Sequence, residues 1–270
     1  MSYFFPLVPR PLARSLSLAI ATCLLSTSFL PLLPSPEAIA APRVSATSRR
    51  RVTPKRNRVN FRVGVKASRY RVGGFSRNSL CGVGKETQAL VPAANAPERL
   101  NVQNANGDFV EQTLSDRPTF FIYMPNGAAT RAKMTVQNEA RTQQLDSVSL
   151  NLGGKSGVIG IPMSATAKPL QVGQKYLWQM TVYCDIAGKM PSVTVSGWVE
   201  RVAAPALSGN LQERAAFLAE QGIWQDAVLA LAQLRQQQPQ NSAIAADWQD
   251  LMTSAGLPAL SQAPIAQIGQ

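Results

Sequence analysis

Histidine is absent from this chain of 270 residues, and only three cysteines are present. Histidine is the usual base that activates a serine or cysteine nucleophile, and it is the commonest protein ligand of transition metals. Its absence excludes Ser-His and Cys-His catalysis, and so few thiols argue against a zinc site. We therefore expect no metal and no cofactor, and we expect that the protein is not an enzyme.

Carboxylates are the catalytic groups that remain, because glycoside hydrolysis requires only two of them. Asp185 and Glu200 form one such pair, but nothing in their spacing separates them from ordinary solvated charges. The fragment GGKS at 153–156 resembles part of a phosphate-binding loop, but Ser149 stands where the first glycine of that loop belongs. A carboxylate-dependent, carbohydrate-active or cell-wall-processing enzyme is the alternative to a non-catalytic protein.

Acidic residues are missing from residues 43–77, which hold twelve of the 27 Lys and Arg residues. From residue 78 onward there are 13 basic and 14 acidic residues, a net charge of −1. The strongly basic character of the chain therefore belongs to one short segment. Its arginines alternate with single apolar residues, Gly and Pro, a composition that cannot bury enough apolar surface to fold alone. Residues 41–77 are predicted to be a basic disordered arm.

The first 40 residues have the organisation of a secretory signal peptide. Arg10 and Arg14 precede an apolar stretch at 16–33, which is followed by the small-residue pattern AIA at 38–40. We expect cleavage after Ala40 and export to the periplasm or cell envelope. An uncleaved signal anchor is the alternative, because the apolar stretch is close to membrane-spanning length.

An exported basic arm does not encounter chromosomal DNA, so nucleic acid is not the expected partner. One interpretation of the arm is a solvated linker, as charge runs usually are. The other is attachment to anionic lipid headgroups or acidic polysaccharide, with each Lys or Arg contributing about 1 kcal/mol near a charged membrane. The candidates for this attachment are Arg49, Arg50, Arg51, Lys55, Arg56 and Arg58.

Two cysteines, Cys81 and Cys184, remain once the signal is removed. In an oxidising compartment two cysteines are more often bridged than free. A disulfide between them would close a loop of about 100 residues and contribute up to about 4 to 5 kcal/mol. Two inert buried thiols are the alternative, because pairing geometry is not readable from the sequence.

Residues 78–203 are predicted to form an antiparallel, immunoglobulin-like β-sandwich. Seven short runs of alternating or β-branched residues are separated by clusters of Gly, Pro, Asn and Asp. The runs are TQALVP at 87–92, PTFFIYMP at 118–125, RAKMTVQN at 131–138, SVSLNL at 147–152, GVIGIPM at 157–163, KYLWQMTVYC at 175–184 and SVTVSGWVERV at 192–202.

Aromatic residues in these runs are expected to fill the core. Side chains alternate along a strand, so Tyr176, Trp178, Met180 and Val182 share one face, and Cys184 is in phase with them. A ligand groove is the alternative for the aromatic side chains Phe120, Tyr123, Tyr176, Trp178 and Trp198, although aromatics are the usual core filler.

Residues 208–257 are predicted to form a small unit of three helices, which makes the fold class α+β. The apolar period changes from two to 3.6 after the last strand run. Asn210 and Glu213 have the spacing of a capping box, and Gly222 can end the first helix. Pro239 and Gly256 mark the ends of the second and third helices.

The stretch GIWQDAV at 222–228, with Pro239 seventeen residues after Gly222, resembles a tetratricopeptide repeat. The resemblance covers one repeat and half of another, with Leu234 where that pattern favours alanine. We expect such a short unit to pack on the sandwich rather than form a long groove. It is either a helical cap or a partner-binding surface, for which the candidates are Trp224, Asp226, Arg235 and Trp248. Residues 258–270 are expected to form a C-terminal tail.

A wider resemblance runs through most of residues 71–257. Its motifs are RVGGFSRNSLC at 71–81, ALVP at 89–92, RPTFFIYMP at 117–125, PLQVGQKYLWQMTVYCD at 169–185, VSGWVERV at 195–202, GIWQDAVLALAQLR at 222–235 and AADWQDLMTSAGL at 245–257. In these motifs the chain is similar to a cyanobacterial family of exported proteins classed as domain of unknown function 928. The resemblance implies a cell-envelope location and supplies no catalytic residues. The favoured function is a non-catalytic protein-binding or scaffold module whose partner is another envelope or membrane protein.

Overall fold

The computed structural model describes residues 58–61, 87–92, 109–125, 129–183 and 191–269. Residues 54–270 belong to one compact unit. The predicted signal peptide lies outside the described residues, as does most of the predicted basic arm.

The described residues form nine strands in two sheets. The four-stranded sheet has the order β1-β3-β6-β9, formed by β1 (Gln88–Ala89), β3 (Thr119–Met124), β6 (Gly157–Pro162) and β9 (Ile265–Ile268). The five-stranded sheet has the order β2-β8-β7-β4-β5, formed by β2 (Val110–Thr113), β8 (Pro191–Arg201), β7 (Lys175–Tyr183), β4 (Arg131–Asn138) and β5 (Gln144–Asn151). The α+β class is confirmed, because three α-helices lie between β8 and β9 in the part of the chain that the structure describes.

The prediction of a purely antiparallel sandwich is wrong at two sheet edges. β2 pairs in parallel with β8, and β9 pairs in parallel with β6. Both strands lie outside the seven runs that the sequence indicated. Three of the four residues in the β2 sequence VEQT are polar, and β9 has only four residues, so neither shows a strong strand pattern. The immunoglobulin-like arrangement stays a prediction.

The core lies between the facing sheets. Trp178, Met180 and Val182 of β7 have no exposed surface, and Tyr176 is 5% exposed, as their alternation predicts. The Phe120 ring stacks on Trp178 with ring centroids 5.1 Å apart. Core filling is therefore confirmed for Phe120 and Trp178, neither of which has exposed surface.

The three helices are α1 (Leu211–Glu220), α2 (Trp224–Gln237) and α3 (Ser242–Ser254). The predicted capping box is present, because Glu213 N donates to Asn210 Oδ1 and Asn210 N donates to Glu213 Oε2. Gly222 and Gly256 adopt φ of 78° and 73° after α1 and α3, a conformation that favours glycine. The helix boundaries are thus set by local sequence.

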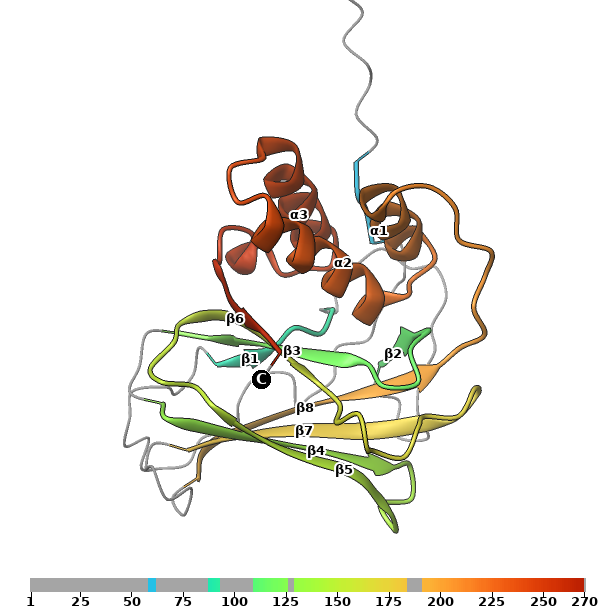
Figure 1. Ribbon diagram of the computed structural model, residues 1–270, viewed down its shortest axis with the longest axis vertical. Coiled ribbons are helices and arrows are strands. Elements are labelled where there is room, and N and C mark those ends of the chain that lie inside the picture. The colour runs from blue at the N-terminus through green and yellow to red at the C-terminus, as the bar shows by residue number, and fades with distance from the viewer. Residues whose placement is uncertain (1–57, 62–86, 93–108, 126–128, 184–190, 270) are drawn as a thin grey trace, which may run out of the picture. The chain divides into compact units, whose positions relative to one another are not determined.

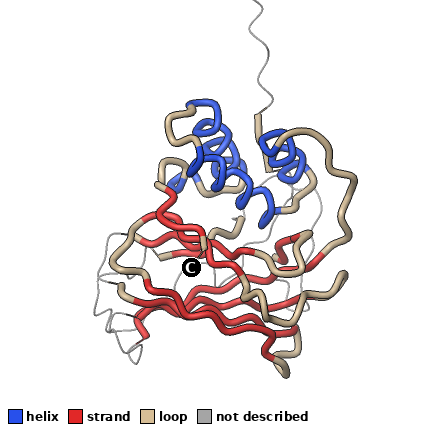
Figure 2. Tube along the Cα trace, viewed as in Figure 1, coloured by secondary structure: helices blue, strands red, loops and turns tan. Residues whose placement is uncertain are grey.

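The helices lie on one side of the two sheets, next to the four-stranded sheet (Figures 1 and 2). α2 contacts β2, β3 and β9. The buried indole of Trp224 donates a hydrogen bond of 2.7 Å to the carbonyl of Leu90, beside β1. Residues of the helices and of the sheets therefore belong to one hydrophobic core.

Two segments contain packed structure that the sequence did not indicate. Residues 258–270, expected to form a tail, contain the 3-10 helix η1 (Pro258–Leu260) and strand β9. Residues 58–61 of the predicted arm pack against the helices, with Val59 and Phe61 each 1% exposed. Apolar side chains that are too few to form a core alone are buried here against a surface formed elsewhere in the chain.

Candidate functional site

Trp224 and Trp248, predicted as partner-binding residues, are fully buried. Trp248 Nε1 donates to Leu260 O at 3.3 Å, and the Arg235 guanidinium lies 5.1 Å from the centroid of the Trp248 ring. Arg235 also donates to Ala263 O at 2.9 Å, and burial lowers the pKa of Arg235. These contacts hold α2, α3 and the C-terminal segment together, so these residues act within the protein.

Asp226, the fourth predicted partner-binding residue, joins the first turn of α2 to the end of β2. Its Oδ2 accepts hydrogen bonds from Thr113 Oγ1 at 2.8 Å and from Leu114 N at 3.0 Å. Burial raises the pKa of Asp226, although both hydrogen bonds act in the opposite direction. The carboxyl group is therefore engaged at the junction between helix and sheet.

Glu111 is a buried carboxyl group that sequence reasoning missed. It lies on β2 with no exposed surface, and Gln225 Nε2 of α2 donates to its Oε2. Burial raises the pKa of Glu111 well above its usual value, while the side chains of Gln225 and Trp178 act to lower it. The Trp178 indole lies close by, but its N–H has no partner of hydrogen-bond geometry among the described residues.

Gly197 on β8 makes room for this buried group. A Cβ atom at this position would lie 2.7 Å from Trp178 Nε1 and 2.8 Å from Glu111 Oε1. A glycine inside a strand often marks such a close approach, so Gly197 is the sequence signal that could have indicated the cluster. The cluster is sealed from solvent and therefore offers no open site.

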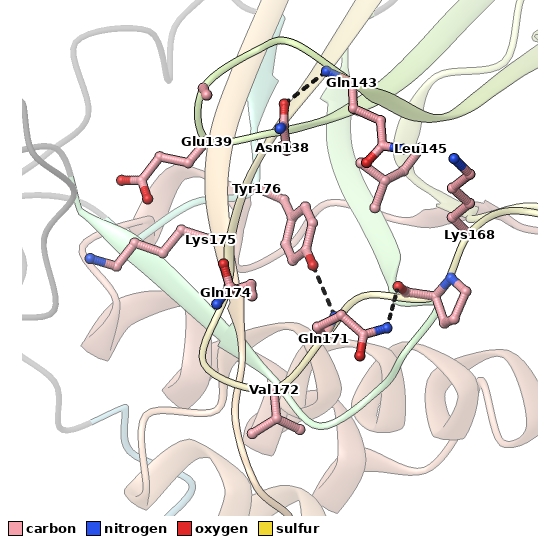
Figure 3. A pocket seen from close by; sticks show the side chains of 12 residues that line it. Asn138, Glu139, Gln143, Leu145, Lys168, Gln171, Val172, Gln174, Lys175 and Tyr176 are labelled. Atoms are coloured by element: carbon pink, nitrogen blue, oxygen red, sulfur yellow. Dashed lines mark hydrogen bonds between the residues drawn. The ribbon is translucent and has the colours of Figure 1, made fainter.

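An open groove of about 750 Å³ lies between the β4–β5 turn and the segment that leads into β7 (Figure 3). Its lining is rich in hydrogen-bonding groups. The amide side chains are Asn138, Gln143, Gln171 and Gln174, the charged ones are Glu139, Lys168 and Lys175, and the apolar ones include Leu145, Val172 and Tyr176.

One wall of the groove is the β4–β5 turn, which Asn138 organises. Gln143 N donates to Asn138 Oδ1 at 3.0 Å, and Asn138 Nδ2 donates to Thr142 Oγ1 at 2.9 Å. Arg141 has a φ of 58°, and its guanidinium lies 6.0 Å from the centroid of the Trp198 ring. The turn is thus fixed by its own side chains.

The opposite wall is tied to the sheet through Tyr176 and Arg201. Gln171 N donates to Tyr176 Oη at 2.9 Å, a bond drawn in Figure 3. Gly173 N donates to Arg201 O at 2.7 Å, and Arg201 Nη1 donates to Leu170 O at 2.7 Å. Both walls are therefore held in place without a ligand.

The groove can supply amide hydrogen bonds, positive charge and one apolar contact. Two lysines and one glutamate line it, a net charge of +1. Val172 is 54% exposed, the one large apolar side chain with this much exposed surface in the part of the chain that the structure describes. Within those same residues, no three Asp, Glu or Cys side chains gather as metal ligands would.

Several predicted residues lie outside the described residues. They are Cys81, Cys184, Arg49, Arg50, Arg51, Lys55 and Arg56, together with Asp185 of the alternative carboxylate pair. Arg58 is described and exposed, and Glu200 is partly buried on β8.

No described helix has the length and apolar character needed to cross a membrane.

Comparison with protein families matches residues 72–265 to the family described as Domain of Unknown Function (DUF928). The matched span includes all nine strands except the last three residues of β9, and all three helices. Residues 58–61 precede it. Comparison with curated proteins finds no match.

Proposed function

This chain belongs to the DUF928 family, and we propose that it is a non-catalytic protein of the cell envelope that binds another exported or membrane protein. The proposal includes export by the signal peptide, a disulfide between Cys81 and Cys184, a cyanobacterial origin and a tetratricopeptide-like nature of the helical unit. The observation that carries the binding function is the preformed groove between the β4–β5 turn and the β7 entry.

The lining of the groove suits an extended, acidic segment of a partner protein. Amide side chains can both donate to and accept from a peptide backbone. Lys168 and Lys175 favour carboxylates on the ligand, and Val172 offers an apolar contact at the rim. A groove held by its own hydrogen bonds loses little conformational freedom on binding, which favours affinity.

The same lining supports a non-catalytic role. Hydrolysis of a glycoside by the usual mechanism requires two carboxyl groups on either side of the bond. Among the described residues, Glu139 is the one carboxylate that lines the groove. Glu111, whose pKa is strongly raised, is sealed in the interior and has no surface to offer a substrate.

The proposal is tested by affinity capture from an oxidised periplasmic extract, with wild-type protein and groove variants compared as bait. Lys168→Glu and Val172→Asp should each abolish capture of a stoichiometric partner that the wild type retains. Lys133→Glu is the charge-matched control, because Lys133 is exposed on β4 away from the groove. The captured protein is then purified and titrated against each variant. Equal affinity for the wild type and both groove variants would remove the groove as the binding site.

A further inference from the structure

Residues 58–61, Arg-Val-Asn-Phe, dock on the helical unit as an extended segment. Val59 and Phe61 are each 1% exposed, whereas Arg58 is exposed to solvent. Figure 1 shows this short segment next to α1. Val59 lines a cavity with residues of α1, and the Phe61 ring packs on Trp224 of α2, so both apolar side chains face the helices.

Specific contacts hold the segment. The Phe61 ring meets the Trp224 ring edge to face, with centroids 5.0 Å apart and an interplanar angle of 74°. Phe61 N donates to Ser254 Oγ at 2.8 Å, and Ser254 Oγ donates in turn to Leu251 O at 3.0 Å. A backbone hydrogen bond combined with apolar anchors at alternate positions is how extended peptides are recognised.

A second groove lies beside residues 58–61, between α1 and α3. It is acidic and only partly filled. A cavity of about 340 Å³ remains next to Val59, lined by residues of α1 and α3. Glu213, Glu220 and Asp247 line this cavity together with Arg58. Glu213 Oε2 accepts from Asn210 N, and Asp247 Oδ2 accepts from Gln212 Nε2. The arm that contains the segment carries basic residues and no acidic ones between residues 43 and 77. Charge complementarity therefore favours a basic peptide here.

We propose that this groove of the helical unit is a binding site for a short, extended, basic peptide with apolar side chains at alternate positions, and that residues 58–61 occupy it as an intramolecular ligand. The site is separate from the groove of the proposed function, and its ligand has the opposite charge. The docked residues precede the family match at residues 72–265, so the body of the family contains the groove but not this ligand.

Intramolecular occupancy predicts a defined competition. A ligand linked covalently to the protein that contains its binding site acts at an effective concentration of about 1 mM. For a free peptide with an intrinsic dissociation constant of about 10 µM, this occupancy weakens apparent binding about 100-fold. Removal of residues 58–61 from the groove should therefore increase the apparent affinity for the free peptide about 100-fold.

The experiment titrates a fluorescent peptide of residues 54–65 (PKRNRVNFRVGV) into full-length protein and follows its anisotropy. The double variant Val59→Ser/Phe61→Ser should bind the peptide about 100-fold more tightly than the wild type. A control peptide with serine at both apolar positions should bind neither protein. Equal affinity of the peptide for wild type and double variant would place the peptide elsewhere and overturn the proposal.

A second form of the protein decides the question if the double variant does not fold. A protease site inserted between Ala67 and Ser68 of the full chain is cut after folding, which leaves Val59 and Phe61 unchanged. The severed segment should exchange with labelled peptide at one site per protein. Failure to exchange would show that residues 58–61 are a permanent part of the core. A wild-type dimer that exchanges arms would place the segment in the groove of a second copy and overturn the intramolecular assignment.

Discussion

Gln225 on α2 donates a side-chain hydrogen bond to Glu111 on β2, and both side chains are buried. This bond crosses the junction between the helical unit and the five-stranded sheet. Asp226, the next residue on α2, accepts from Thr113 at the end of the same strand. Two consecutive helix residues thus fix the position of β2, an edge strand of its sheet.

Replacement of Glu111 by glutamine should reduce the pH dependence of stability. Burial raises the native pKa of Glu111, so between the ordinary value of 4.5 and the native value the folded protein keeps a proton that the unfolded chain releases. Stability is therefore full below the ordinary value and falls as pH rises toward the native one. Glu111→Gln should remove this fall and should therefore have a higher free energy of unfolding than the wild type at about pH 8.

Urea unfolding at pH values from about 5 to about 8 measures this difference. Some slope should remain in the variant, because burial also raises the pKa of Asp226. An unchanged slope in Glu111→Gln would mean that Glu111 is ionised in the native protein.

Truncation of Asp226 should destabilise the contact between α2 and β2. Asp226→Ala leaves the Thr113 hydroxyl and the Leu114 N–H without their acceptor, at a cost of about 1 to 3 kcal/mol. Asp226→Asn keeps one acceptor oxygen and should lose less. Thermal unfolding of the two variants compares them at neutral pH, and equal losses would argue against the hydrogen bonds as the cause.

Gly197→Ala should be destabilising although the change adds a single methyl group. The new Cβ would lie 2.7 Å from Trp178 Nε1, and this indole is fully buried. Overpacking of a dense interior costs about 1 to 3 kcal/mol. Thr194→Ala, at an exposed position on the same strand, is the control and should change stability by less than about 1 kcal/mol. Chemical denaturation of both variants tests the difference, and equal stability would contradict the tight packing at Gly197.

Much of the fold was predictable because local patterns carry it. Asn210 with Glu213 forms the predicted cap, and the alternation along β7 places Trp178 and Met180 in the core. β2 and β9 were missed because their strand character comes from parallel pairing with distant residues rather than from their own composition.

The candidate site was harder to predict, because tertiary packing decides exposure. Trp224 and Trp248 have the residue type of interface anchors, but the helices turn both into the core. The groove takes its residues from the β4–β5 turn and the segment before β7, which are neighbours only in the folded chain. The burial of Val59 likewise depends on helix residues about 150 positions later in the chain.

The predicted disulfide gives a test that is independent of the described residues. Cys184→Ser should lower the melting temperature of oxidised protein by about 10 °C, since a loop of about 100 residues contributes up to about 4 to 5 kcal/mol. Reduced wild type and reduced variant should melt at the same temperature. Identical melting of oxidised and reduced wild type would show that the cysteines are not bridged.

The role of the basic arm is tested by removing its positive charge while its docked residues are kept. Replacement of Arg49, Arg50, Arg51, Lys55 and Arg56 by glutamine removes positive charge but leaves the docked residues Val59 and Phe61 in place. If the arm attaches to an anionic surface, sedimentation with vesicles of anionic lipid should fall strongly, because each basic residue contributes about 1 kcal/mol. Wild-type sedimentation should also fall as salt is raised. Val59→Ser/Phe61→Ser, which keeps every charge, should sediment like the wild type. Equal sedimentation of the glutamine variant and the wild type would instead support a solvated linker.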